Sequence, residues 1–141
     1  MPLGNLTTRF AIPADLDLVG QDQCPPPAIV RRKIEWREIV VAELDGGLVG
    51  YLRLEYLWSP TPYVALIHVL PEHRCQGVGK ALLAFAEKFL REQGHPALYS
   101  SSQVDEAEPQ AWHRHVGFEE CGVIAGVNEG GVGEVFFRKR L

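Results

Sequence analysis

A long amphipathic helix is the feature of this 141-residue chain that most restricts its fold. Apolar residues recur at intervals of three and four between Val78 and Leu90, which predicts a helix with one apolar face. Gly94 and Pro96 favour its end, because glycine accepts the left-handed conformation after a helix and proline cannot continue one. The apolar face has to be buried against another layer of structure, so the segments around the helix decide the fold class.

The segments on both sides of this helix predict strands. Tyr63–Leu70 is an almost continuous apolar run, interrupted only by His68, and is typical of a central strand covered on both faces. Ala97–Ser100 predicts a short strand after the helix. The order strand, helix, strand favours a parallel pair joined by a right-handed crossover.

The other segments predict further strands and short helices around the same sheet. The turn Asp45–Gly47 between two runs rich in β-branched residues predicts a hairpin. The remaining predicted elements are a strand over residues 9–12, short helices over 14–19 and 29–36, a stiff proline connector over 24–27, a helix over 106–116 and a terminal hairpin of 119–124 with 134–138. Together these elements predict one α/β domain, residues 1–141, built on a mixed sheet.

Composition excludes several classes of protein. The 14 Lys and Arg residues against 18 Asp and Glu residues give a net charge of −4, whereas proteins that bind nucleic acid carry a basic excess. No apolar run is long enough to span a membrane, and the first residues show no secretory signal. The three cysteines, an odd number at wide spacing, favour a reducing compartment. We therefore expect a cytoplasmic protein with neither nucleic acid nor membrane as partner.

The segment Arg74–Lys80, between the apolar strand and the long helix, predicts an anion-binding turn. Gly77 and Gly79 allow the backbone to approach a ligand, and the amides at a helix N-terminus favour a pyrophosphate. An ordinary glycine turn before a helix is the alternative. The segment matches neither a Walker A loop nor the dinucleotide-binding G-x-G-x-x-G loop, because Leu82 stands at the third glycine position.

Residues 74–79 match [QR]-x-x-G-x-[GA], and the chain resembles the GNAT superfamily of acetyltransferases. Residues 67–74 look like the family's strand leading through a Pro-Glu turn, and residues 111–118 are similar to its late helix. The resemblance covers essentially the whole chain and is densest over residues 63–118. It implies a GNAT-like central mixed sheet of about six to seven strands with flanking helices, in which the fourth and fifth strands are parallel and splayed.

The resemblance also implies a co-substrate, acetyl-CoA, and no metal. Acetyl-CoA would bind where the fourth and fifth strands splay apart, with backbone groups around Val69 pairing with the pantetheine and polarising the thioester carbonyl. Amides from Gln76 to Lys80 would hold the pyrophosphate. The implied cofactor-binding residues are Val69, Arg74, Cys75, Gln76, Gly77, Val78, Gly79 and Lys80.

The chain departs from the family pattern at its expected general acid. Histidine, at His113, stands where the family often has a tyrosine in its late helix. A charged imidazole could protonate the leaving thiolate, or solvent could do so and His113 would be a plain helix residue. Glu55 and His68 are the candidate bases, although a strand-face glutamate and a core histidine are common without a catalytic role. A chain of water molecules could also replace a single base.

We expect an N-acetyltransferase that acts on a primary amine of a small molecule or a peptide N-terminus. The segments that vary between such enzymes, here Ala28–Trp36, Trp58–Tyr63 and Asn128–Gly133, would form the acceptor pocket, and the negative net charge is compatible with a cationic amine. Glu35, Glu129 and Glu134 could supply local negative charge, although exposed glutamates are common without such a role. The missing tyrosine motivates an alternative, a catalytically weak acyl-CoA-binding or sensor module. Edge strands of the terminal hairpin would allow a homodimer.

Overall fold

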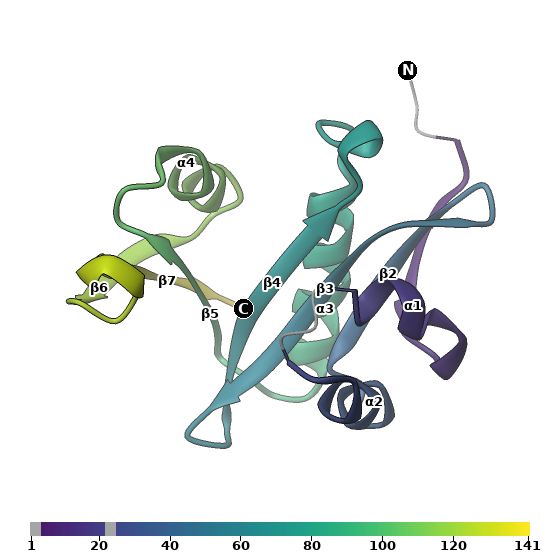
Figure 1. Cartoon of the computed structure of the whole chain (residues 1–141), viewed down its shortest axis with the longest axis horizontal. Helices are drawn as coiled ribbons and strands as arrows, with labels where there is room; N and C mark the ends of the chain where they lie inside the picture. Colours follow the sequence, from purple (N-terminus) through teal and green to yellow (C-terminus); the bar gives the residue numbers. More distant parts are fainter. Residues whose placement is uncertain (1–3, 22–24) are drawn as a thin grey trace. The chain divides into compact units, whose positions relative to one another are not determined.

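A computed structural model describes residues 4–21 and 25–141 of the chain as a mixed α/β fold with a seven-stranded sheet (Figure 1). The strand order is β1-β2-β3-β4-β5-β7-β6. The strands are β1 (Leu6–Phe10), β2 (Ile39–Leu44), β3 (Gly47–Leu57), β4 (Thr61–Val69), β5 (Ala97–Gln103), β6 (Glu119–Ile124) and β7 (Glu134–Arg140). The helices are α1 (Leu16–Val19), α2 (Pro27–Glu35), α3 (Val78–Glu92) and α4 (Ala107–His115), with short 3-10 turns at Pro13–Asp15, Pro71–His73 and Glu129–Gly131.

Most predicted elements are confirmed. The hairpin of β2 and β3 turns at Asp45 and Gly46, both with positive φ, as its sequence indicated. Strands β4 and β5 run parallel, with Tyr63 paired to Tyr99. The proline connector falls partly on residues 22–24, outside the described residues, and α2 begins at the last proline, Pro27, where proline's fixed φ suits a first helical turn.

The prediction that β4 is covered on both faces is wrong for its second half. From Ala65 to Val69 every side chain is only half-buried. A strand packed on both faces would bury its whole apolar run. The continuous apolar run therefore does not mark a strand that is buried on both faces.

Contacts divide the chain into two compact units. Unit 1 comprises Met1–Leu54 and Leu66–Lys88, and unit 2 comprises Glu55–Ala65 and Phe89–Leu141. Strands β3 and β4 and helix α3 each contribute residues to both units.

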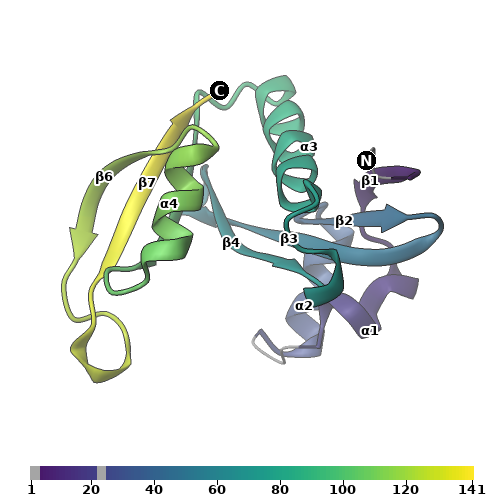
Figure 2. The ribbon, with the colours of Figure 1, turned by 90° about the horizontal axis from the view of Figure 1, so that it is seen from above.

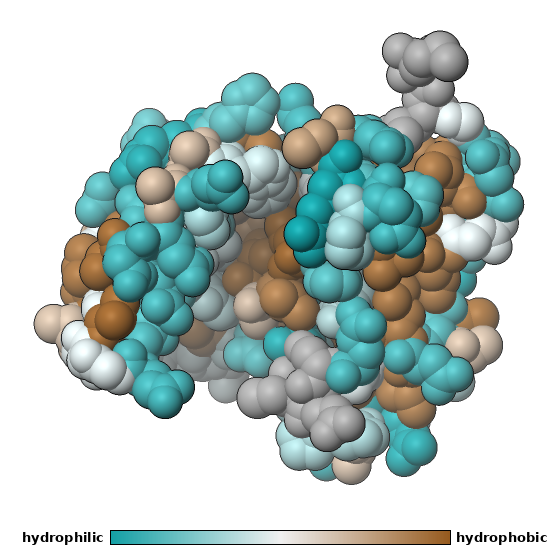
Figure 3. All heavy atoms as spheres, turned by 45° about the horizontal axis from the view of Figure 1, so that its top comes forward, coloured by the Kyte–Doolittle hydropathy of each residue, from teal (hydrophilic) through white to brown (hydrophobic). Residues whose placement is uncertain are grey.

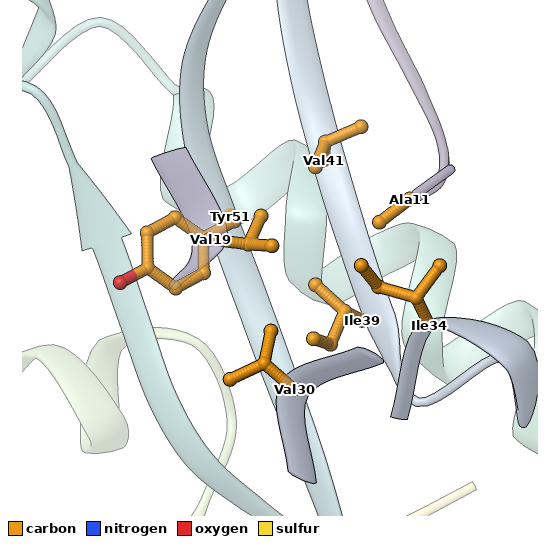
Figure 4. Packing of buried hydrophobic residues seen from close by; sticks show 7 residues of the cluster. All are labelled: Ala11, Val19, Val30, Ile34, Ile39, Val41 and Tyr51. Atoms are coloured by element: carbon orange, nitrogen blue, oxygen red, sulfur yellow. The ribbon is translucent and has the colours of Figure 1, made fainter. Parts of the chain in front are cut away.

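In unit 1, helices cover both faces of β2 and β3 (Figure 2). Helices α1 and α2 lie on one face, where side chains from β2, β3 and both helices point toward one another (Figure 4). This cluster comprises Ala11, Val19, Val30, Ile34, Ile39, Val41 and Tyr51, all buried. Helix α3 lies on the other face, and the ring of Phe85 meets the edge of Phe10 at a centroid distance of 5.0 Å. The apolar face predicted for α3 is thus the side by which the helix is anchored to the sheet.

In unit 2, β7 pairs antiparallel with both β5 and β6. Helix α4 ends at His115, and Gly117, with a φ of 98°, takes the left-handed position that follows the helix; the amides of Gly117 and Phe118 bond to carbonyls of the last turn. Strand β6 lies at the sheet edge with every residue exposed.

Exposed apolar side chains follow this edge, at Val123, Ile124 and Val127, and brown atoms gather on the left of Figure 3. The homodimer expected from this edge stays a prediction. None of the helices in the described ranges is long and apolar enough to cross a membrane.

Candidate active site

The turn between β4 and α3 brings backbone amides together at the helix N-terminus. Cys75 and Gly77 have φ values of 60° and 85°, so two residues of this short segment are left-handed. The amide of Ala81 bonds to the carbonyl of Gly77 at 3.0 Å, which makes Gly77 the residue that caps α3. A β-branched residue would be strained at this φ, and this is why the turn needs glycine here.

The five amides from Gln76 to Lys80 have no acceptor within the described part of the chain. Gln76, Gly77 and Lys80 are exposed, and Gly79 is half-buried. The positive end of the helix dipole acts at the same place. The turn predicted from the sequence therefore has the hydrogen-bonding capacity to hold a pyrophosphate.

Gly50 lets β3 lie close to β4 and to the first residue of α3. A Cβ atom at Gly50 would stand 2.7 Å from the carbonyl oxygen of His68 and 3.3 Å from Cγ1 of Val78. The amide of Leu70 bonds to the carbonyl of Val49 at 2.9 Å, which fixes the end of β4 against β3. Sequence reasoning missed this residue, although a glycine inside a strand pattern is a signal of close backbone approach.

Arg74 engages the backbone at the end of β4. Its Nε donates to the carbonyl of Val69 at 3.0 Å, and the side chain is otherwise exposed. A ligand that uses this carbonyl has to displace Arg74, whereas one that approaches only the turn amides does not. Cys75 is exposed beside it and is a free thiol.

His113 of α4 is buried, with 6% of its surface exposed. Its Nδ1 lies 2.7 Å from the carbonyl of Pro109 and its Nε2 lies 2.7 Å from Oγ of Ser100. A carbonyl only accepts, so Nδ1 carries the proton and the neutral ring's Nε2 accepts from the Ser100 hydroxyl. The ring also stacks on Phe137 at 4.7 Å.

Burial lowers the pKa of His113, and the Pro109 carbonyl opposes this shift only in part. The imidazole is therefore held neutral, with both nitrogens already engaged in the fold. This geometry favours the plain-helix alternative left open by the sequence, and a catalytic role for His113 stays a prediction.

The two candidate bases lie in different units. His68, half-buried in unit 1, packs its ring against Tyr51 at a centroid distance of 5.5 Å. Glu55 is half-buried in unit 2, and its negative charge contributes to the raised pKa of the Tyr63 hydroxyl. Their catalytic roles stay predictions as well.

Unit 2 contains a polar network that sequence reasoning did not assemble. The hydroxyl of Tyr63 lies 2.6 Å from Oγ of Ser101, which donates to Oε2 of Glu134 at 2.6 Å. Nδ2 of Asn128 donates to the other carboxylate oxygen of Glu134 at 2.9 Å. The sequence indicated two of the segments involved, Trp58–Tyr63 and Asn128–Gly133, and named Glu134 as a source of charge. No sequence pattern indicated Ser101, because a short run of serines does not show which hydroxyl forms a hydrogen bond in the folded protein.

A model of the acetyltransferase (GNAT) family matches residues 12–118, about three quarters of the chain. The chain belongs to this family. The match contains the turn amides and His113 but ends before Asn128 and Glu134, so the polar network depends partly on residues beyond it.

Relatives of this GNAT chain agree in fold and in part of its sequence. The streptothricin acetyltransferase of Streptomyces lavendulae is 30% identical over 99 residues, 70% of this chain and 52% of the relative. The structure of the ribosomal-protein-alanine N-acetyltransferase from Brucella melitensis has a TM-score of 0.81 at 25% identity and covers 96% of this chain and 99% of its own. A protein of Bacillus anthracis str. Ames, solved with acetyl coenzyme A, has a TM-score of 0.67 at 24% identity, covering 73% of this chain and 61% of its own. The chain spans about half the length of the curated relatives it matches.

A cavity of this GNAT chain lies outside the expected site. It has a volume of about 580 Å³, belongs to unit 2, and is lined by residues that were not predicted as site residues: Gly117, Glu119, Glu120, Cys121, Arg138, Lys139 and Arg140.

Metal binding finds no support in the described side chains. Among residues 4–21 and 25–141, no three His, Cys, Asp or Glu side chains gather in a way that could hold a metal ion.

The buried His113 predicts a pH-dependent stability of this GNAT chain. Below pH about 6.5 the unfolded chain takes up a proton that folded His113 resists, so its contribution to the free energy of unfolding is lost as the pH falls from that value toward the lowered folded pKa. We expect the stability difference between the native chain and His113→Asn to shrink between pH 7.5 and about 5. Urea unfolding at each pH measures it. His115→Asn, an exposed histidine of the same helix, is the control; an unchanged difference would contradict the prediction.

Proposed function

We propose that this chain is an acetyl-CoA-dependent N-acetyltransferase that transfers an acetyl group to a primary amine by direct attack in a ternary complex. The observation that carries the proposal is the row of five amides at the start of α3 that have no acceptor among the described residues, in a chain of the GNAT family. A structure of the same fold holds acetyl coenzyme A. The whole chain is proposed to act as one acetyltransferase domain, residues 1–141.

The turn would hold the co-substrate by its pyrophosphate. Amides of Gln76 to Lys80 donate to the phosphate oxygens, and the side chains of Arg74 and Lys80 add positive charge at the rim. The backbone around Val69 would pair with the pantetheine once Arg74 releases the carbonyl. Holding the thioester in one orientation lowers the entropic cost of attack by the amine.

The reaction removes two protons from the ammonium form of the acceptor and gives one to the leaving thiolate. The neutral amine nitrogen bonds to the acetyl carbonyl carbon and then loses its second proton, the carbon–sulfur bond breaks, and CoA leaves as a thiolate that takes up a proton. The acceptor must first lose its ammonium proton, for which Glu55, His68 or a water chain is the proposed base. His113 would protonate the thiolate only if it left its bonds to Pro109 and Ser100, so solvent is the better-supported donor.

The acceptor is proposed to be a primary amine of a small molecule or a peptide N-terminus. The names of the relatives include both kinds, streptothricin on one side and a ribosomal-protein alanine on the other. A cytoplasmic location, expected from the cysteine usage, belongs to the same proposal. The alternative, a sensor module that binds acyl-CoA and turns over weakly, shares the turn and differs only in turnover.

Thermal unfolding with and without acetyl-CoA tests the co-substrate. A ligand that binds only the native state should add about 2.7 kcal/mol at 100 times its Kd, which is several degrees for a chain of this size. We expect a clear shift with acetyl-CoA and free CoA and none with ATP. No shift with either CoA species would overturn the proposal. Thiol release with a panel of amines then separates the enzyme from the sensor, because only the enzyme shows amine-dependent release.

A further inference from the structure

The polar network of unit 2 has a defined direction of hydrogen bonding. The carboxylate of Glu134 can only accept hydrogen bonds, so the Ser101 hydroxyl donates its single proton to Oε2 of Glu134. The oxygen of Ser101 must then accept the proton of the Tyr63 hydroxyl, 2.6 Å away. The phenol oxygen is left with lone pairs and no proton to offer, so it can only accept from a further partner.

The carboxylate of Glu134 is held by neutral groups. Its two oxygens accept from the hydroxyl of Ser101 and the amide of Asn128, and no ion pair in the described ranges involves it. Glu134 is only half-buried, so its charge reaches the surface of the network. A carboxylate on neutral donors alone leaves the network with a net negative charge.

The phenol of Tyr63 lies in the field of two carboxylates. Burial raises its pKa most, the hydrogen bond with Ser101 lowers it in part, and the charges of Glu134 and Glu55 raise it further, so the net shift keeps the hydroxyl protonated. The Tyr63 ring stacks on Phe136 at a centroid distance of 5.9 Å. Both rings are half-buried, so the network is bordered by aromatic surface. An acceptor oxygen, a nearby uncompensated charge and aromatic faces are together suited to an ammonium group.

We propose that Tyr63, Ser101 and Glu134 form the subsite that binds the cationic amino group of the acceptor, with the Tyr63 oxygen accepting an N–H hydrogen bond and Glu134 supplying the charge. The inference rests on the proposed function, because it names the acceptor subsite of the same enzyme. The proposal predicts that the acceptor is a primary amine and that it binds in its protonated form. Asn128 is a positioning residue, since it orients the carboxylate from the loop before β7.

The test uses n-butylammonium chloride as the probe and 1-butanol as its neutral counterpart, both without acetyl-CoA. The amide ¹H–¹⁵N signals of Ser101, Gly133 and Glu134 are followed during each titration. We expect saturable shifts at millimolar n-butylammonium and none with 1-butanol. Because no co-substrate is present, the result is independent of the thermal-shift test with acetyl-CoA, and either proposal can fail without the other.

Variants of the network and a matched control decide the assignment. Glu134→Gln keeps the shape of the side chain and removes its charge, so we expect about tenfold weaker binding of n-butylammonium. Tyr63→Phe keeps the ring and its stacking on Phe136 and should weaken binding about threefold or more. Glu108→Gln removes one charge from an exposed glutamate of α4, outside the segments expected to form the acceptor pocket, and should leave binding unchanged.

Equal binding by the native chain and Glu134→Gln would overturn the proposal, and so would equal shifts with 1-butanol. The spectrum of each free variant shows whether it remains folded. With an accepted amine substrate, Glu134→Gln should raise the KM for the amine about tenfold and leave the KM for acetyl-CoA unchanged. A rise in both constants would indicate a structural role and would also overturn the assignment.

Discussion

Replacing Gly77 with valine is expected to weaken acetyl-CoA binding about 100-fold or more while the protein stays folded. Gly77 has a φ of 85°, which a β-branched residue adopts only at a cost of about 1–3 kcal/mol. The chain relieves this strain by rotating the peptide groups around residue 77, and the amides of Gly77 and Val78 then no longer point with those that follow. Each lost hydrogen bond to a charged phosphate is worth about 1.5–3 kcal/mol, so two of them account for the expected loss.

The measurement is isothermal titration of acetyl-CoA into the native chain and the variant. Gly46→Val is a closely matched control, because Gly46 has a φ of 86° and its substitution brings the same backbone strain to the β2–β3 turn, where a Cβ would meet no atom within 4 Å. We expect Gly46→Val to lose stability and keep its affinity. If Gly77→Val bound acetyl-CoA as tightly as Gly46→Val, the turn would not be the pyrophosphate site.

Replacing His113 with alanine is expected to lower the free energy of unfolding by about 3–5 kcal/mol, the range found when a buried aromatic ring is truncated. The change removes the stacking on Phe137 and leaves the hydroxyl of Ser100 and the carbonyl of Pro109 without their partner. Urea unfolding at pH 7.5 measures the loss. His115→Ala, on the exposed side of the same helix, should cost far less. A loss below about 1 kcal/mol for His113→Ala would contradict the structural role.

Turnover of folded His113→Asn separates structure from catalysis. Asparagine is polar and smaller than the ring, and its amide can still donate to the Pro109 carbonyl, but it cannot act as an acid. Because both ring nitrogens are engaged in the fold, we expect kcat to fall less than about tenfold. A fall of 100-fold or more at unchanged acetyl-CoA affinity would establish His113 as the acid that the family resemblance suggested.

The periodic features of the fold could be predicted from the sequence. The apolar face of α3, the hairpin turn at Asp45–Gly46 and the glycine ends of α3 and α4 each depend on neighbours within a few residues. The conformation of the turn Arg74–Lys80 was also predictable, because its amides are adjacent in the chain and their direction follows from Gly77 and the helix that begins after it; that the turn binds an anion stays a prediction. The role of Ser101 was not predictable, since it depends on atoms from other strands and no local pattern indicates them, whereas Gly50 carried a local signal but not the identity of the strand it approaches.

Local sequence patterns were therefore enough to predict the order of strands and helices, the family resemblance and the turn proposed to hold the co-substrate. The bonds at both nitrogens of buried His113, and the network that Tyr63, Ser101 and Glu134 share, are visible only in the folded structure. Backbone amides take their direction from local conformation. A side chain's pKa, by contrast, depends on which groups the folded chain brings to it from residues distant in the sequence.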